Sequence, residues 1–332
     1  MTRVLITGTA GFIGFHLVNV LLSEGLRVHG YDGMTDYYDV ALKQRRHDML
    51  LQNSDFSATQ GMLEDQRKFD KIADEFKPEV IIHLAAQAGV RYSLENPRDY
   101  LNSNVIGTLN VMDAARRHEV KHLLMASTSS VYGANTKMPF NEIEKADTQL
   151  TIYAATKKAN ESMAHSYAHL YNLPTTMFRF FTVYGTWGRP DLALYKFVSA
   201  IIENRPIDIY NHGKMYRDFT YVEDFIDGMV KIMENENAKN EILNLTYGAS
   251  RSISEMVEIL KNEFGQMDLQ YMPKDNLMPD RGTLSVEKAK RLIGYDPQFP
   301  LEIGFVQYIK WYKSLMKSYA HLFEEQKPAL KL

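Results

Sequence analysis

The chain of 332 residues contains no cysteine. This absence excludes disulfides, thiolate metal sites and a cysteine nucleophile, and it fits a reducing compartment, so we expect the protein in the cytoplasm. An excess of positive charge is also missing, because 38 basic residues face 41 acidic ones and the formal net charge is -3. We therefore expect no nucleic-acid partner, since a polyanion is bound by clustered cations.

Long apolar runs are absent as well. The first residues, MTRVLITGTAGFIG, hold a short apolar stretch broken by glycines, which is too brief for the core of a signal sequence. No later stretch approaches the roughly 20 apolar residues of a membrane span. We expect a soluble globular protein with no membrane contact, long enough for one large or two moderate domains.

Short apolar runs alternate with amphipathic segments through the first half of the chain. The runs are RVLITG (3–8), RVHGYD (27–32), FSATQG (56–61), EVIIHLA (79–85), HLLMAST (122–128) and TTMFRFF (175–181). Helical patterns such as FIGFHLVNVLLSEG (12–25) lie between them. This alternation predicts an α/β fold with a Rossmann-type, doubly wound parallel sheet covered by helices on both faces.

The alternation loosens from about residue 182. Short strand patterns follow at IDIYN (207–211) and DFTYV (218–222), and Ser252 with Glu255 forms a capping box that starts a helix. We predict a Rossmann domain over residues 1–181. Residues 182–332 should form a smaller C-terminal α/β lobe that binds substrate, with some segments returning to the first domain.

A glycine-rich turn predicts a dinucleotide site. Gly8, Gly11 and Gly14 follow the first strand and open a helix, whose N-terminal amides and positive dipole end suit a pyrophosphate. The second strand ends at Asp32, eighteen residues after Gly14. A carboxylate there accepts hydrogen bonds from ribose hydroxyls and repels a 2′-phosphate, which favours NAD over NADP.

A tyrosine and a lysine stand four residues apart in the helical pattern YAATKKANESMAHSYAHLY. This spacing places Tyr153 and Lys157 on one helix face. A free phenol is a poor base at neutral pH, but a nearby ammonium and a positive nicotinamide ring favour the phenolate. Such a tyrosine can take a proton from a hydroxyl while hydride leaves the same carbon for NAD.

Together these motifs resemble the extended short-chain dehydrogenase/reductase family. The spacing GxxGxxG, HLAAQAGVRYS (83–93), Asn104, STSSVYG (127–133) and YAATK (153–157) occur in the family's order over nearly the whole chain. The resemblance implies that Tyr153 and Lys157 are catalytic and that Thr128 assists at the reacting hydroxyl. It implies a homodimer formed by the helix after Pro97 and the helix bearing Tyr153. It also implies NAD contacts at Gly8, Gly11, Phe12, Ile13, Gly14, Asp32, Leu63, Leu84, Ala85, Ala86 and Lys157.

The two residues after Thr128 distinguish branches of the sugar-nucleotide enzymes. The 4,6-dehydratases resemble this segment but carry Asp-Glu there, and UDP-glucuronate decarboxylases carry a glutamate at the second position, whereas this chain has Ser129 and Ser130. Three stretches resemble UDP-glucuronate 4-epimerases, namely RFFTVYGTWGRPDLALYKF (179–197), DYYDVALKQ (36–44) and GKMYRDFTYVEDF (213–225). The resemblance implies epimerisation at C4 of a UDP-sugar through a transient 4-keto species, with UDP-glucuronate as the expected substrate.

The same resemblance assigns residues to the substrate. Thr182 and Arg189 would join Ser129 and Ser130 around the sugar carboxylate, and holding the carboxylate there would keep the 4-keto acid from losing carbon dioxide. The expected substrate contacts are Gln87, Arg91, Ser129, Ser130, Thr182, Arg189, Arg217 and Arg281, the last two at the pyrophosphate. No metal site is expected.

Two features leave alternatives open. Met62 stands where the family usually has an aspartate beside adenine, so a side-chain contact to NAD is missing. The tail MPDRGTLSVEKAKRLIGY (278–295) differs from that of glucuronate epimerases and resembles that of other sugar-nucleotide epimerases. A neutral UDP-hexose or UDP-N-acetylhexosamine is therefore the alternative substrate. A protein of another class, a non-catalytic NAD-sensing regulator, would be expected to lack the tyrosine or the lysine.

Overall fold

A computed structural model describes residues 1–274 and 282–324. Its centre is a seven-stranded sheet of order β10-β6-β5-β4-β1-β2-β3, in which every neighbouring pair is parallel. The strands are β1 (Arg3–Thr7), β2 (Arg27–Asp32), β3 (Phe56–Gln60), β4 (Val80–His83), β5 (His122–Ala126), β6 (Thr175–Arg179) and β10 (Ile242–Asn244). The first six have the strand order of a Rossmann fold, which confirms the predicted fold class.

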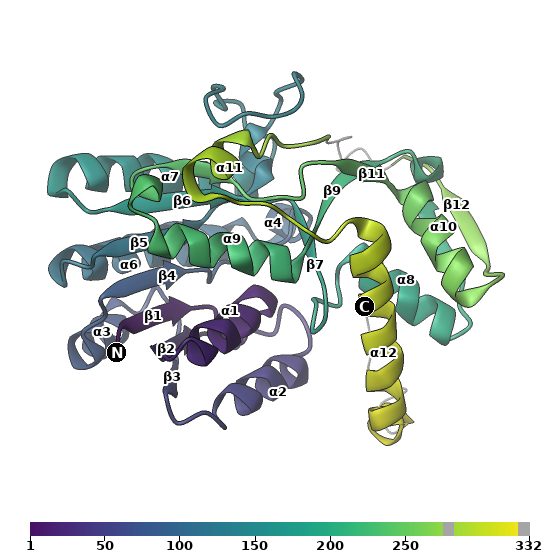
Figure 1. Ribbon diagram of the computed structural model, residues 1–332, viewed down its shortest axis with the longest axis horizontal. Coiled ribbons are helices and arrows are strands. Elements are labelled where there is room, and N and C mark those ends of the chain that lie inside the picture. Colours follow the sequence, from purple (N-terminus) through teal and green to yellow (C-terminus); the bar gives the residue numbers. More distant parts are fainter. Residues whose placement is uncertain (275–281, 325–332) are drawn as a thin grey trace.

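Helices cover both faces of this sheet (Figure 1). In β1, Val4 and Ile6 point to one side and Leu5 to the other, as the alternation of a strand requires. One layer contains α1 (Phe12–Ser23), α9 (Val222–Glu234) and α11 (Glu287–Ile293), and the other contains α3 (Gln66–Phe76), α6 (Gly107–Arg117) and α7 (Ile152–Tyr171). Helix α2 (Val40–Leu50) packs beside α1. Both faces are therefore buried, which explains the apolar runs in the central strands β1, β4 and β5.

An irregular helical stretch lies between β4 and α6. It consists of α4 (Tyr92–Glu95), α5 (Pro97–Tyr100) and the π-helical segment η1 (Leu101–Ile106), which continues directly into α6. π-Helical turns are uncommon and occur frequently at functional sites. Asn104 is fully buried within this turn.

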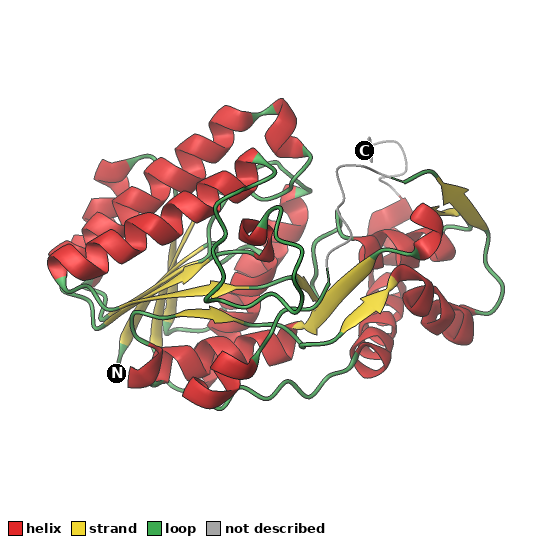
Figure 2. Cartoon of the chain, turned by 90° about the horizontal axis from the view of Figure 1, so that it is seen from above, coloured by secondary structure: helices red, strands yellow, loops and turns green. Residues whose placement is uncertain are grey.

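The second half of the chain builds a separate lobe beside the sheet (Figure 2). Its three-stranded sheet has the order β11-β9-β7, and a parallel pair joins β12 to β8. Around their own apolar core pack α8 (Ala193–Ile202), α10 (Ile253–Phe264) and α12 (Leu301–Glu324). The strands are β7 (Thr182–Tyr184), β8 (Ile207–Tyr210), β9 (Tyr216–Tyr221), β11 (Ser250–Ser252) and β12 (Leu269–Met272).

Short 3-10 turns complete the chain, at η2 (Ser129–Tyr132), η3 (Asn211–Gly213) and η4 (Glu236–Ala238). Helix α10 begins with the predicted capping box, since the Ser252 hydroxyl accepts from the Glu255 amide and the Glu255 side chain accepts from the Ser252 amide. Within the described ranges, no helix has the length and apolar character needed to cross a bilayer.

Candidate active site

Many of the sequence-predicted site residues follow the carboxyl ends of the parallel strands. Strand β1 leads into the glycine turn, β4 into residues 84–91, and β5 into Ser127–Ser130. The C-terminal lobe lies beside these carboxyl ends (Figure 1). Open parallel sheets bind ligands at this edge, so both the position and the residue types indicate a ligand-binding site there.

The glycines of the turn are there for identifiable steric reasons. Gly8 has a φ of +84°, and a Cβ on it would lie 2.8 Å from the Ala85 amide nitrogen. A Cβ on Gly14 would lie 2.1 Å from the Gly8 carbonyl oxygen. Gly11 is the N-cap of α1 and provides no side-chain cap, so the first-turn amides have no side-chain acceptor there. The turn therefore suits the pyrophosphate of a dinucleotide.

Asp32 lies at the end of β2 and shapes the same turn. Its Oδ2 accepts from the Ala10 amide at 2.9 Å and its Oδ1 accepts from the Met34 amide at 2.8 Å. Each carboxylate oxygen can accept more than one hydrogen bond, so both oxygens can still receive ribose hydroxyls. Met62 lies next to Gly33, where a Cβ would come within 2.7 Å of its sulfur, and thus beside the predicted adenosine end.

The remaining predicted NAD contacts surround this turn. Leu63 is buried, and its carbonyl accepts from Asn110 Nδ2 at 2.7 Å. The amides of Leu84 and Ala85 both donate to Thr7 Oγ1 at 3.2 Å. Of the other three predicted contacts, Phe12 is buried while Ile13 and Ala86 are half-buried.

Sequence reasoning missed a buried hydrogen-bond chain that begins at Thr7, whose hydroxyl accepts from the Leu84 and Ala85 amides. His83 Nδ1 lies 2.7 Å from Thr7 Oγ1 and its Nε2 lies 2.9 Å from Thr108 Oγ1, which in turn accepts from Asn160 Nδ2. Burial, with a smaller effect of the Lys157 charge, lowers the pKa of His83 to about 3. His83 is therefore neutral at physiological pH and holds β1, β4, α6 and α7 together.

The Tyr153–Lys157 pair stands in the first turns of α7. This helix is capped by Thr151, whose Oγ1 accepts from the Ala154 amide at 3.1 Å. The Tyr153 ring lies edge-on to Tyr100, with ring centroids 6.1 Å apart. The side chain of Tyr153 is half-buried and that of Lys157 is buried. The helix that bears this predicted pair packs against η2, the turn that follows β5.

Lys157 carries a buried amine in an unusual electrostatic setting. Burial lowers its pKa to about 8, and the carboxylate of Glu161 one turn later opposes that shift only in part. Within residues 1–274 and 282–324, the amine makes no hydrogen bond or ion pair. A buried donor of this kind fits a ligand that brings its own acceptors, such as the ribose hydroxyls of a nicotinamide nucleotide.

The four consecutive hydroxyl residues at 127–130 divide into two groups. Ser127 Oγ donates to Glu161 Oε1 at 2.6 Å and is thus committed to the protein interior. Thr128 Oγ1 accepts from the Ser130 amide at 3.2 Å and caps η2, which packs against α7. The Ser129 amide donates to the Phe180 carbonyl at 2.8 Å. Thr128, Ser129 and Ser130 are therefore held at the end of β5 beside the helix of Tyr153.

Behind Ser127 lies a buried ion pair that sequence reasoning also missed. Arg179 Nε lies 2.8 Å from Glu161 Oε1, and its Nη2 lies 2.7 Å from Oε2. Burial would raise the pKa of Glu161, but the bidentate contact with Arg179 outweighs it and lowers that pKa. The guanidinium also lies 4.7 Å from the Tyr132 ring centroid. The only signal in the sequence was the position of Glu161 one turn after Lys157.

Asn104, which the sequence singled out, joins the loop after β4 to α7. Its Oδ1 accepts from the Gln87 amide at 2.7 Å, and its Nδ2 donates to the Gln87 carbonyl at 3.1 Å and to Thr156 Oγ1 at 3.2 Å. Gln87 is half-buried and Arg91 is exposed at the start of α4. The backbone of Gln87 is thus fixed relative to the helix that bears Tyr153.

The predicted carboxylate-binding residues lie on β7 and the loop that follows it. Thr182 is half-buried at the start of β7. Arg189 forms a bidentate pair with Asp191, with Nε 3.0 Å from Oδ1 and Nη2 2.5 Å from Oδ2. Burial disfavours the charged form of this guanidinium and so acts to lower its pKa. The nearby Asp191 carboxylate outweighs burial, and the pKa of Arg189 is raised. The fork of Arg189 thus presents only its remaining N–H groups to a ligand.

Two further arginines were predicted at the pyrophosphate. Arg217 lies on β9, half-buried, and its Nη1 donates to the Tyr216 carbonyl at 2.7 Å. Arg281 lies outside the described residues. Trp187, in the loop of Arg189, has a left-handed φ of 56°, and its ring centroid lies 5.6 Å from that of Trp311 on α12.

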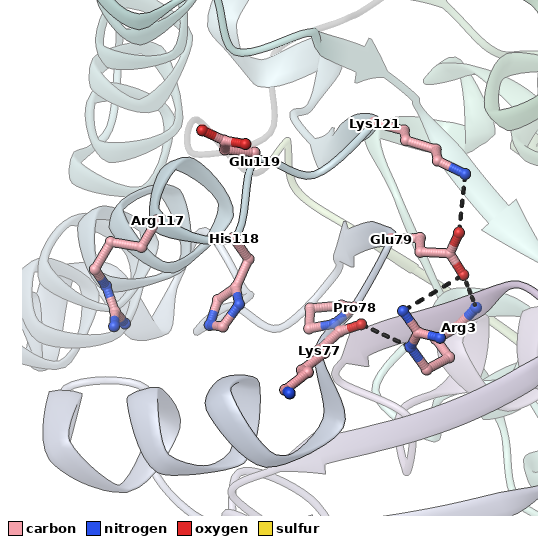
Figure 3. Close-up of a pocket in the computed structure, with 8 residues that line it drawn as sticks. All are labelled: Arg3, Lys77, Pro78, Glu79, Arg117, His118, Glu119 and Lys121. Carbon is pink, nitrogen blue, oxygen red and sulfur yellow. Dashed lines mark hydrogen bonds and ion pairs between the residues drawn. The ribbon is translucent and has the colours of Figure 1, made fainter.

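A shallow pocket lies at the opposite, amino edge of the sheet (Figure 3). Glu79 accepts there from the Lys121 ammonium at 2.8 Å and from the Arg3 amide at 3.2 Å, and Arg117 and His118 both contact Asp74. Five of its charged or titratable side chains, those of Arg3, Glu79, Arg117, His118 and Lys121, are therefore paired within the protein. The lining residues are Arg3, Lys77, Pro78, Glu79, Arg117, His118, Glu119 and Lys121. In the part of the chain that the structure describes, no three His, Asp or Glu side chains gather as metal ligands.

Comparisons with known proteins agree with this geometry. The model of the NAD dependent epimerase/dehydratase family matches residues 4–246. A "Probable UDP-glucuronate 4-epimerase" of Rhizobium meliloti is 47% identical over 93% of this chain and 96% of its own length. "UDP-glucuronate 4-epimerase 4" of Arabidopsis thaliana is 37% identical over 94% of this chain and 75% of its own.

Solved structures give the same result. A UDP-glucuronic acid 4-epimerase from Bacillus cereus, in complex with UDP-glucuronic acid and NAD, superposes with a TM-score of 0.89 at 29% identity and covers 95% of this chain and 100% of that one. A UDP-glucose 4-epimerase from Thermotoga maritima, solved with UDP-glucose, has a TM-score of 0.87 at 26% identity, again covering 95% and 100%. The backbone alone therefore does not separate an acidic from a neutral sugar.

Proposed function

The chain belongs to the NAD dependent epimerase/dehydratase family, and on this premise we propose that it interconverts UDP-glucuronate and UDP-galacturonate by NAD-dependent epimerisation at C4. The observation that carries the proposal is the 47% identity, over 93% of the chain, to a probable UDP-glucuronate 4-epimerase. The chemistry of the cleft supports it, because a phenol, a buried amine and a row of hydroxyls meet a glycine turn suited to a dinucleotide. NAD, when bound, supplies the acceptor that takes hydride from C4 and returns it.

The proton steps belong to Tyr153 and its neighbours. Tyr153 accepts the proton of the C4 hydroxyl as hydride leaves the same carbon, and Thr128 hydrogen-bonds the reacting oxygen. The Lys157 ammonium favours the phenolate, and it binds the ribose of the cofactor with the N–H groups that the protein leaves unused. The 4-keto sugar then turns in the cleft, and Tyr153 returns the proton after hydride has reached the opposite face.

The residues after β5 and β7 account for the acidic sugar. Ser129, Ser130 and Thr182 offer neutral hydroxyls to the sugar carboxylate, and Arg189 offers the N–H groups not used by Asp191. A 4-ketouronic acid is a β-keto acid, which loses carbon dioxide when the breaking bond aligns with the carbonyl π system. If the enzyme holds the carboxylate so that this bond is not aligned with the carbonyl π system, carbon dioxide is not lost. Gln87 and Arg91 complete the sugar end, while Arg217 and Arg281 bind the pyrophosphate.

A homodimer in the cytoplasm completes the proposal. Exposed apolar side chains follow the helices after Pro97 and after Thr151, and such side chains stabilise a helical interface when a partner covers them. They are Leu101, Ile106, Ile152, Leu170 and Tyr171. Sedimentation-velocity analysis would give twice the mass of the chain if the two helices pair between subunits, and the mass of a single chain otherwise.

The test of the reaction is incubation of the purified protein with UDP-glucuronate and, separately, with UDP-glucose. Proton NMR resolves the products, because the coupling of H4 reports its orientation. UDP-galacturonate in the first tube and no change in the second is the expected result. Conversion of the neutral sugar alone would replace the proposed substrate with the neutral-sugar alternative.

A matched variant separates catalysis from binding. Tyr153→Phe removes only the phenolic oxygen, so it should still bind NAD and UDP-glucuronate but lose at least about 100-fold in kcat, as expected for a general base. An equal rate of conversion in the variant and the wild type would contradict the assigned role. Absence of turnover by the wild type with either sugar would favour the non-catalytic, NAD-sensing alternative.

A further inference from the structure

A buried arginine on α2 joins the glycine turn to the loop that carries Arg189. Arg46 is 0% exposed. Its Nη1 donates to the Ala10 carbonyl at 3.1 Å and lies 2.9 Å from the Tyr38 hydroxyl. Its Nη2 donates to the carbonyls of Trp187 at 2.6 Å and Gly188 at 3.2 Å. One guanidinium therefore bridges two segments, one 36 residues before it in the chain and the other 141 residues after it.

The surroundings of Arg46 show that this bridge is costly. Each of its hydrogen-bond acceptors is a neutral group, and in the described ranges it forms no ion pair. Its buried Nε has no acceptor. Burial lowers the pKa of Arg46, but an arginine remains charged in a protein. A buried cation without a carboxylate partner is destabilising by itself, so this bridge between the two segments is made at a cost in stability.

A second side chain anchors the same loop from α1. His16 Nε2 lies 2.7 Å from the Thr186 carbonyl oxygen. Burial lowers the pKa of His16 to about 4, so its ring is neutral at physiological pH and Nε2 must carry the proton that it donates. Three consecutive carbonyls, those of residues 186, 187 and 188, are thus held by the first two helices of the cofactor half.

We propose that Arg46 and His16 are positioning residues that set the preference for an acidic sugar, because they fix the loop of Arg189 to the glycine turn. The next residue after the three anchored carbonyls is Arg189 itself, so greater mobility of the loop displaces the Arg189 guanidinium. The inference rests on the proposed function, in which Arg189 contacts the sugar carboxylate. Loosening the loop should therefore weaken binding of UDP-glucuronate but not of UDP, which lacks the glucuronosyl group and its carboxylate.

The test uses two variants of the NAD-loaded protein. Arg46→Lys keeps the charge but loses the fork, and His16→Ala removes one anchor and no charge. Calorimetry gives Kd for UDP-glucuronate and for UDP, and kinetics give KM and kcat. The Kd for UDP-glucuronate divided by the Kd for UDP should rise about threefold in His16→Ala and about tenfold in Arg46→Lys. These are the changes expected from the loss of one and of two hydrogen bonds, respectively. Arg67→Lys, exposed on α3, is the control and should leave the ratio unchanged.

The outcomes separate the inference from the function on which it rests. A ratio that stays at the wild-type value in both variants overturns the inference, and so does a parallel loss of both ligands, which indicates general damage. A raised ratio with unchanged Kd for UDP supports it. Turnover of UDP-glucuronate by the wild type is recorded in the same series, so failure of the proposed function would be seen there, independently of the variants.

Discussion

At the scale of single residues, neighbours in the chain have different tasks. The Ser127 hydroxyl donates to a buried carboxylate, whereas the Thr128 hydroxyl caps the turn at the strand end by accepting from the Ser130 amide. A row of similar side chains is therefore not one functional unit. The side chain that precedes the turn secures the core, and those in the turn face the cleft in the proposed function.

This division gives a prediction about the product. Thr182→Ala and Ser130→Ala should each yield detectable pentose nucleotide from UDP-glucuronate, because the 4-keto acid then aligns for loss of carbon dioxide. Ser127→Ala is the control, and it should lower the free energy of unfolding by about 1–3 kcal/mol without pentose formation. Proton NMR of the products decides, and the absence of pentose from both test variants would refute the assigned role of the hydroxyls.

The pH dependence follows from Lys157. Its pKa is lowered to about 8 by burial, so the amine loses its charge, and with it the support for the phenolate, as the pH rises through that value. We expect kcat to fall along this alkaline limb. In Lys157→Arg, kcat at neutral pH should fall about tenfold, because a guanidinium fits the buried site poorly. The fall of kcat at alkaline pH should nevertheless move above about pH 10, because a guanidinium keeps its charge there. A variant whose limb stays near pH 8 would show that another group titrates there.

At the scale of elements, α10 illustrates a start signal that is local. Ser252 and Glu255 satisfy each other's backbone amides in the structure as the sequence predicted. Ser252→Ala should lower the free energy of unfolding by about 1 kcal/mol. Urea denaturation measures it, and Ser254→Ala, exposed on the same helix turn, should change stability by less than about 0.5 kcal/mol. Equal losses in both variants would contradict the cap.

The junction of α7 with β6 depends on the Glu161–Arg179 pair. Glu161→Gln leaves a buried guanidinium unpaired and should cost about 3–5 kcal/mol, whereas Glu258→Gln, in an exposed pair with Lys261, should cost less than about 1 kcal/mol. The folded-state pKa of Glu161 is lowered, so its contribution is present above the unfolded pKa and is lost as the pH falls through the folded value. Unfolding of both variants from pH 7 to pH 3 tests this, and a constant difference between Glu161→Gln and the wild type would disprove the linkage.

At the scale of the whole molecule, the features that the sequence predicts depend on residues close together in the chain, and those that it misses depend on residues far apart. The parallel strands, the glycine turn and the capping box rest on patterns within a few residues, and all three are present in the structure. Arg46 stands next to Arg45 in the sequence, and nothing in that pair of charges indicates that Arg46 is buried, as the structure shows. Its three carbonyl acceptors are 36, 141 and 142 residues away, so no local pattern could reveal them.

Local sequence patterns also leave side-chain contacts in the candidate active site undetermined. The sequence predicted Arg189 as a ligand of the sugar but not its pairing with Asp191, because two residues of separation in a loop do not determine whether side chains meet. The boundary at residues 181 and 182 stays a prediction. Strand β10, from the second half of the chain, pairs with β6 in the large sheet, with Ile242 opposite Met177.

The contact between Trp187 and Trp311 has an optical consequence. These are the only two tryptophans among the 332 residues, one on the loop of Arg189 and the other on α12. Indoles at 5.6 Å share excitation, so their emission depends on the distance between loop and helix. Adding UDP-glucuronate should change the intrinsic fluorescence, and Trp311→Phe should reduce that change; unaltered emission at saturating ligand would show that the loop does not move. The protein thus contains a label-free reporter whose signal can be followed in a stopped-flow instrument on the timescale of each binding event.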